Sequence, residues 1–301
     1  MNIQQILNSP FAVKLAFFIG RIIPPGIGYP ICNSIGEWIA SRRDSKVTHA
    51  VRVNQWVARG ANLEKEALDQ VVQETLRNNA RDLYTFYHYM HDPNAMQRMI
   101  NINPKARQWV ERFEFAERGL VIVGLHLSNF DFVLQSLCRQ GFKPMILTIS
   151  DPKGGRRVEY ELRKKTGLNM VPASVNTLRQ AIKHLQQGGM VLAGMDHPVV
   201  NPKYQPRFFA RPASLPTHYI SLALKAHVPV VIMAASQQTD GIYHVLSSEP
   251  MEMERDFDRR REIICNAERI LKQAEDFIRL APQQWNVPWP IWPELLEDVM
   301  N

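Results

Sequence analysis

Short apolar runs alternate with amphipathic stretches along the chain after Gly119. The apolar runs are bounded by glycine, proline or polar residues, a pattern that is typical of buried strands. We therefore predict strands over residues 120–125, 145–149, 168–172, 190–195, 229–235 and 242–247. Between them, apolar residues recur three and four positions apart, which predicts helices over residues 130–140, 155–166, 175–187, 214–226 and 256–280. This alternation predicts the α/β class, with a mixed sheet flanked by helices.

The segment from Asp44 to Phe115 has a charged, helical pattern. Apolar residues from Leu63 to Tyr84 recur at helical spacing, and His91-Asp-Pro93 predicts the end of that helix. Four aromatic residues near this end either pack in a core, the more common case, or border an apolar ligand tunnel; they are Tyr84, Phe86, Tyr87 and Tyr89.

Residues 10–40 are the most apolar part of the chain, without the cleavage site of a signal peptide. A bilayer-spanning helix needs about 20 mostly apolar residues, but Lys14, Arg21 and Pro24-Pro25 interrupt the run. Two short helices lying in a membrane interface fit better, and a pair of ordinary core helices is the alternative. In the interfacial case, aromatic side chains enter the membrane and basic ones meet headgroups; these are Phe17, Phe18 and Trp38, and Lys14, Arg21, Arg42 and Arg43.

These patterns divide the chain into three regions. We expect membrane-interacting helices over residues 1–43, a helical region packed on the core over residues 44–118, and an α/β core over residues 119–301. The absence of repeats and of low-complexity linkers indicates that the helical part packs onto the sheet.

The charge of the chain narrows the choice of partners. The 301 residues are 45% hydrophobic and carry a net charge of +7, which favours a folded chain with anionic partners such as headgroups or an acidic carrier protein. No nucleic-acid-binding module is recognisable. Three cysteines without metal-like spacing indicate core thiols in a reducing compartment; they are Cys32, Cys138 and Cys265.

The stretch His126-Leu-Ser-Asn-Phe-Asp131 follows an apolar run. A strand, a tight turn and a helix start would bring His126 and Asp131 together. An imidazole can take a proton from a hydroxyl, and a carboxylate on its other nitrogen fixes the tautomer and stabilises the cation. We therefore expect a catalytic pair, with a structural histidine as the alternative.

Two other chemistries fit this cluster less well. Ser128 lacks the Gly-x-Ser-x-Gly setting of a nucleophile elbow. A metal held by His126, Asp131 and His197 has no recognisable ligand spacing, so no metal site is predicted.

The His126-x4-Asp131 signature resembles that of the lysophospholipid and glycerolipid acyltransferase superfamily. More closely, the chain resembles the late lauroyl and myristoyl acyltransferases of lipid A biosynthesis and the phosphatidylinositol mannoside acyltransferases. The further motifs follow in order as Arg163-x3-Gly167, Asp196, Arg207-Phe-Phe209-Ala-Arg-Pro212-Ala and Glu275-x2-Ile-Arg-x2-Pro282-Gln-Gln-Trp285.

The resemblance implies transfer of a fatty acyl group from an acyl carrier protein or coenzyme A thioester to a lipid or glycolipid hydroxyl, without a metal or redox cofactor. It makes His126 the general base and Asp131 its orienting partner. It implies an anionic membrane as a partner, at the cytoplasmic face of the inner (plasma) membrane, with peripheral or N-terminal anchoring. Substrate contacts are expected from Asn129, Arg163, Asp196, Arg207 and Phe208.

Each of these substrate-contact residues has more than one interpretation. Asn129 either holds the turn or binds the developing oxyanion. Arg163 either contacts substrate, at a phosphate or at the reacting carbonyl, or lies on a solvated helix face. Asp196 contacts the acceptor, braces a site arginine or forms a turn before proline. Arg207 and Phe208-Phe209 form a lip under headgroup and acyl chain, or the phenylalanines belong to the core.

Two departures from the family pattern leave the acceptor open. Ala210 stands where lipid A acyltransferases usually have glycine, and Asn286-Val-Pro-Trp289-Pro-Ile-Trp292 replaces a basic cluster. The functional alternatives are a non-catalytic lipid-binding protein of the membrane surface and a hydrolase of acyl thioesters or lipids.

Overall fold

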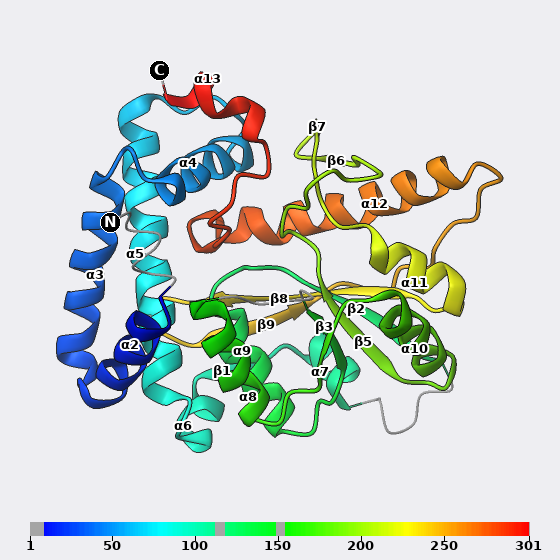
Figure 1. Cartoon of the computed structure of the whole chain (residues 1–301), viewed down its shortest axis with the longest axis horizontal. Helices are drawn as coiled ribbons and strands as arrows, with labels where there is room; N and C mark the ends of the chain where they lie inside the picture. Colours follow the sequence, from blue (N-terminus) through cyan, green and yellow to red (C-terminus); the bar gives the residue numbers. More distant parts are fainter. Residues whose placement is uncertain (1–8, 112–117, 149–153, 301) are drawn as a thin grey trace.

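A mixed seven-stranded sheet forms the centre of the computed structural model, which describes residues 9–111, 118–148 and 154–300 (Figure 1). The strand order is β1-β9-β8-β2-β5-β3-β4, and the pairs are parallel except for antiparallel β8 and β9. The strands are β1 Ile100–Ile102, β2 Leu120–Gly124, β3 Met145–Thr148, β4 Met170–Pro172, β5 Met190–Gly194, β8 Val230–Gln237 and β9 Tyr243–Ser247. A small hairpin, β6 Arg207–Phe208 and β7 Arg211–Pro212, lies outside this sheet.

Helices surround the sheet. Before β2 they are α2 Pro10–Ile22, α3 Pro25–Ser41, α4 Lys46–Ala58, α5 Lys65–Tyr89, α6 Pro93–Arg98 and α7 Pro104–Glu111. After β2 they are α8 Phe130–Arg139, α9 Gly155–Lys165, α10 Val175–Gln186, α11 His218–Ala226, α12 Arg259–Leu280 and α13 Leu296–Met300. The 3-10 turns are η2 Pro282–Gln284 and η3 Pro293–Leu295.

The predicted mixed sheet and its flanking helices are confirmed. Each of the six predicted strands and five predicted helices has a counterpart, although α11 begins at His218 rather than at residue 214. Residue 149 of one predicted strand and residues 112–115 of the predicted helical segment lie outside the described residues. The sequence reading missed β1, because a strand of three residues is too short to show a period.

Both faces of the sheet are covered at its central strands β2, β5 and β8, which is why these strands are almost continuously apolar. Val121 and Val123 of β2 pack in one cluster with α10, α11 and α12, whereas Ile122 packs in a second cluster with α6 and α8. The helices α11 and α12 lie on one side of the sheet and α8 lies on the other (Figure 1).

Small residues bring α3 against α5. Gly28, Cys32 and Gly36 are the buried positions of α3, and a Cβ at Gly36 would lie 2.6 Å from the Arg77 Cα atom. The large apolar residues of α3 therefore face outward, and Trp38 is 46% exposed. No described helix is long and apolar enough to cross a membrane.

The long helix expected from Leu63 is α5, and its aromatic residues pack in the protein. Tyr84, Phe86 and Tyr87 are buried, and the Phe17 ring of α2 meets Tyr87 edge-on with centroids 5.7 Å apart. The aromatic run thus joins α2 to the core.

Candidate active site

The carboxyl ends of β2 and β5 place two polar side chains next to each other. These strands are parallel neighbours, and Gly124 pairs with Gly194 in their register. Two residues beyond each glycine, the chain reaches His126 and Asp196. Parallel strands end at the same edge of a sheet, where ligand-binding groups gather. Gly194 lacks a side chain, and a Cβ there would lie 3.7 Å from His126 Cε1.

Asp196 fixes the imidazole of His126. The His126 Nδ1 atom lies 2.6 Å from Asp196 Oδ1, and the His126 backbone N–H donates to Oδ2 at 3.0 Å. The indole Nε1–H of Trp285 also donates to Oδ2, at 2.9 Å. Asp196 is fully buried and its carboxylate accepts three hydrogen bonds, so it acts as an acceptor for Nδ1–H and leaves Nε2 of His126 as the basic nitrogen.

Asp131 does not occupy the position expected for it on the His126 ring. It lies in the first turn of α8, and its Oδ2 accepts a hydrogen bond and ion pair from the Arg163 guanidinium of α9. Asp196, rather than the expected Asp131, thus bonds the Nδ1 atom of the His126 ring, because the first turn of α8 turns the Asp131 carboxylate toward α9. The catalytic role expected for Asp131 stays a prediction. Arg163 is thereby held at the cluster rather than on a fully solvated helix face.

The charges of the cluster shift the pKa values of His126, Asp196 and Arg163. Burial acts to lower the pKa of His126, but the negative charge and hydrogen bond of Asp196 outweigh burial and raise it above the ordinary value. Burial acts to raise the pKa of Asp196, yet the His126 charge and the hydrogen bonds lower it. For Arg163, the charges of Asp131 and Glu159 outweigh burial and raise the pKa. The pKa of His126 is thus raised on balance, although the positive charge of Arg163 acts to lower it.

A C-terminal strap, residues 282–291, closes the other side of the cluster. Residues 126–128 and 284–286 run antiparallel: Asn286 N donates to His126 O, and Ser128 N donates to Gln284 O, both at 2.7 Å. Asn54 of α4 holds the strap by donating to Val287 O at 3.0 Å and to Trp289 O at 2.9 Å. The strap therefore holds Trp285 where its indole N–H reaches the Asp196 carboxylate.

Asn129 holds the turn that carries His126. Its Oδ1 caps α8 by accepting from Phe132 N at 3.4 Å, and its Nδ2 donates to the Asp82 carbonyl of α5 at 2.7 Å. The side chain is 5% exposed, so of its two expected roles this geometry fits the turn and not an oxyanion contact.

Asp82 is a buried acid that the sequence reading missed. Tyr243 of β9 donates to its Oδ1 at 3.1 Å. Burial raises the pKa of Asp82 to about 7, although the Tyr243 hydrogen bond and the Arg81 charge act to lower it. A carboxyl group inside a charged helical segment carries no sequence signal that distinguishes it from solvated neighbours.

The chain matches the model of one known protein family. The model of the bacterial lipid A biosynthesis acyltransferase family matches residues 4–291, which is nearly the whole chain. The chain belongs to this family. The protein is accordingly an acyltransferase, and the expected relationship to the lipid A acyltransferases is confirmed. A comparison with curated proteins gives no match.

The β6–β7 hairpin of this acyltransferase lies beside the strap. Phe208 is fully buried between Phe209 and the rings of Trp285 and Trp292, so its expected contact with substrate does not fit its position. Arg207 is exposed, and its backbone N–H donates to the Glu268 carboxylate of α12 at 2.9 Å. The hairpin therefore packs Phe208 and Phe209 against the Trp285 ring.

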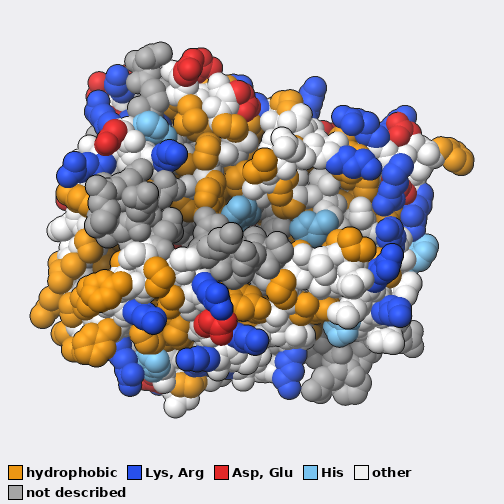
Figure 2. Space-filling view, viewed as in Figure 1, with side chains coloured by type: hydrophobic (Ala, Val, Ile, Leu, Met, Phe, Trp, Pro, Cys, Tyr) orange, Lys and Arg blue, Asp and Glu red, His pale blue; other side chains and the backbone are white. Residues whose placement is uncertain are grey.

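A second histidine lies near the first in the acyltransferase. The His197 ring is 6.4 Å from the His126 ring and 4.3 Å from the Trp289 ring of the strap, measured between centroids. Histidine side chains are visible in a hollow near the centre of the face in Figure 2. Over residues 9–111, 118–148 and 154–300, no group of three or more His, Cys, Asp or Glu is placed to hold a metal ion.

Proposed function

We propose that this protein transfers a fatty acyl group from an acyl carrier protein or coenzyme A thioester to a hydroxyl of a membrane lipid or glycolipid, with no metal or redox cofactor. In this reaction His126 Nε2 takes the proton of the acceptor hydroxyl as its oxygen attacks the thioester carbonyl. The tetrahedral adduct then loses the thiolate, which takes the proton from His126. A C–O bond has formed, a C–S bond has broken, and the imidazole is restored.

The observation that carries this proposal is the bond between His126 Nδ1 and Asp196 Oδ1 at 2.6 Å. A fully buried carboxylate on Nδ1 fixes the tautomer that has a lone pair on Nε2 and stabilises the cation formed during attack. This arrangement suits a base that must accept and then return one proton.

Arg163 has the electrophilic role in the proposal. The Asp131 carboxylate orients its guanidinium, and a fixed positive charge near the reacting carbonyl stabilises the oxyanion that develops. The negative charge of Asp131 also adds to the raised pKa of His126. Asp131 is thus a positioning residue for Arg163 rather than the partner of the imidazole ring.

An acyl-transfer assay tests the assignment. Membrane lipid extract is incubated with an acyl-carrier-protein or coenzyme A thioester and either wild type or His126→Ala, and products are identified by mass spectrometry. We expect acylated lipid from wild type and a loss of about a hundredfold or more with the variant. Equal amounts of acylated lipid from both proteins would show that His126 is not the catalytic base. Free fatty acid without acylated lipid would identify a hydrolase.

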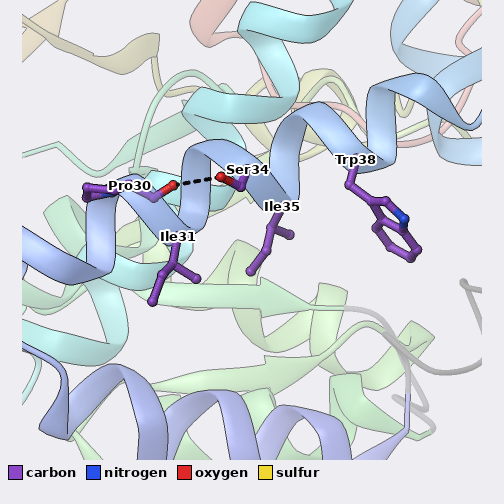
Figure 3. A pocket seen from close by; sticks show the side chains of 5 residues that line it. All are labelled: Pro30, Ile31, Ser34, Ile35 and Trp38. Carbon is purple, nitrogen blue, oxygen red and sulfur yellow. Dashed lines mark hydrogen bonds between the residues drawn. The ribbon is translucent and has the colours of Figure 1, made fainter.

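The second part of the proposal is that the protein associates peripherally with the cytoplasmic face of the inner membrane. Ile31, Ile35 and Trp38 project from the same side of α3, over a depression of about 400 Å³ (Figure 3). Exposed apolar side chains gather on the flank where Figure 1 places α2 and α3 (Figure 2). A chain charge of +7 favours an anionic surface and an acidic carrier protein.

A further inference from the structure

The helices α2 and α9 lie side by side (Figure 1), and residues of both line a groove. Its volume is about 510 Å³, within the range of small-molecule sites. The lining residues are Pro10, Lys14, Phe17, Gly154, Arg157, Val158, Glu161, Leu162 and Lys165.

The rim of the groove is cationic. Lys14, Arg157 and Lys165 are exposed, and Glu161 is the only acidic residue in the lining. Within the described part of the chain, none of these three cations forms an ion pair, in contrast to Arg163 on the same helix. The rim therefore offers charge to an anionic group from outside the chain.

The floor of the groove is apolar. Phe17, Val158 and Leu162 are half-buried there, and the neighbouring surface of α2 exposes large apolar residues. They are Phe11, Leu15, Phe18, Ile19 and Ile22. A free phosphate would meet the cations but leave the floor empty, whereas a molecule with an anionic head and apolar chains would cover both.

We infer that the groove between α2 and α9 binds one anionic glycerophospholipid, with its phosphate at Lys14, Arg157 and Lys165 and its chains along Phe17 and Leu162. None of the cluster residues His126, Asp131, Arg163 and Asp196 lines this groove. Leu162 lines the groove while its neighbour Arg163 reaches Asp131, and adjacent helical residues point about 100° apart. The inference deepens the proposed membrane association but does not depend on acyl transfer.

Titration calorimetry with short-chain lipids below their micelle concentration tests the site without a membrane. We expect saturable binding of dihexanoyl phosphatidylglycerol with one site per chain. The phosphatidylcholine analogue and glycerol phosphate should each bind about tenfold more weakly, because one lacks net charge and the other lacks chains. His126→Ala should bind as wild type does, so this result is independent of the acyl-transfer assay.

Matched variants separate the groove from general surface charge. Lys14→Gln with Lys165→Gln should weaken phosphatidylglycerol binding about tenfold or more, and Val158→Trp should block it by filling the groove with no change of charge. Arg179→Gln with Lys183→Gln removes the same charge from exposed positions on α10 and should leave binding unchanged.

Thermal unfolding of each variant checks that it is folded. Three outcomes would each overturn the site. The first is an equal loss of binding with the α10 control, and the second is unchanged binding by folded Val158→Trp. The third is binding only to phosphatidylglycerol vesicles and never to the monomeric lipid.

Discussion

At the residue scale, His126 has one ring nitrogen fixed by Asp196 and the other left for a substrate. The Asp196 carboxylate is fully buried, and it satisfies the His126 N–H, the His126 Nδ1–H and the Trp285 indole together. Loss of this carboxylate would leave several buried donors unpaired, at a cost of about 1–3 kcal/mol each. The same residue therefore serves stability and, in the proposed reaction, the basicity of His126.

Replacement of Asp196 by Asn should change the pH profile of acyl transfer. His126 must be neutral to accept a proton, so the rate of wild type rises with pH through a pKa above the ordinary value. Without the Asp196 charge this pKa falls, so the acidic limb moves to lower pH, and kcat falls about a hundred- to ten-thousand-fold because the tautomer is no longer fixed. The measurement is the pH dependence of kcat.

Asp131→Asn is the control for this prediction. It removes a charge near His126 but leaves the Nδ1 bond intact, so its effect on the acidic limb should be the smaller one. A larger shift with Asp131→Asn than with Asp196→Asn would contradict the pairing.

At the scale of single elements, the β6–β7 hairpin carries local strain. Its two-residue turn is Phe209 with φ 49° and Ala210 with φ 61°, and a type I′ turn requires positive φ at both positions. The hairpin persists because Glu275 of α12 accepts the Phe209 N–H at 2.6 Å and Phe208 is packed in the core. Alanine at a turn position with positive φ has a conformational cost that glycine would not have.

Ala210→Gly should stabilise the protein by about 1 kcal/mol, because glycine adopts positive φ without a Cβ clash. The free energy of unfolding in urea measures this. Ala181→Gly, at a buried helical position of α10, should instead destabilise by about 1 kcal/mol or more. Destabilisation by both variants would show that the turn is not strained.

The outward side of α3 makes a separate prediction. Small residues face α5, so Ile31, Ile35 and Trp38 are left exposed. Replacement of these three by Gln should reduce co-sedimentation with phosphatidylglycerol vesicles about tenfold or more, because buried apolar area is lost from the interface.

The control for the α3 variant replaces apolar residues that are exposed elsewhere. Val200→Gln with Phe257→Gln removes side chains that are 91% and 111% exposed and should leave vesicle binding unchanged. An equal loss in the control would place membrane contact outside α3.

At the scale of the whole molecule, the helical N-terminal part and the last segment hold the site together. Asn54 is buried on α4 and bonds three backbone groups of the strap, including Ile291 N at 3.0 Å. Gln284 exchanges two hydrogen bonds of 2.8 Å with the backbone of Gln237 in β8. The strap thus joins α4, the sheet and the His126 turn.

Asn54→Ala should lower the free energy of unfolding by about 3 kcal/mol, because it leaves strap groups buried and unpaired. Acyl transfer measured well below the unfolding transition should also fall, because the strap carries Trp285. Asn94→Ala, at an exposed position on α6, should change neither. Lost stability with full activity would show that the strap does not position Asp196.

The sequence by itself determined the α/β class, most of the helices and strands, and His126 as a central residue, because hydrophobic periodicity and local motifs encode these features along the chain. Only the tertiary structure decided which carboxylate meets His126. Asp196 lies 70 residues away and reaches the ring because β2 and β5 pair in register, a choice that no local pattern records. Likewise, Gly28 and Gly36 read as small residues in an apolar segment, and only their packing on α5 turns Ile31 and Trp38 outward.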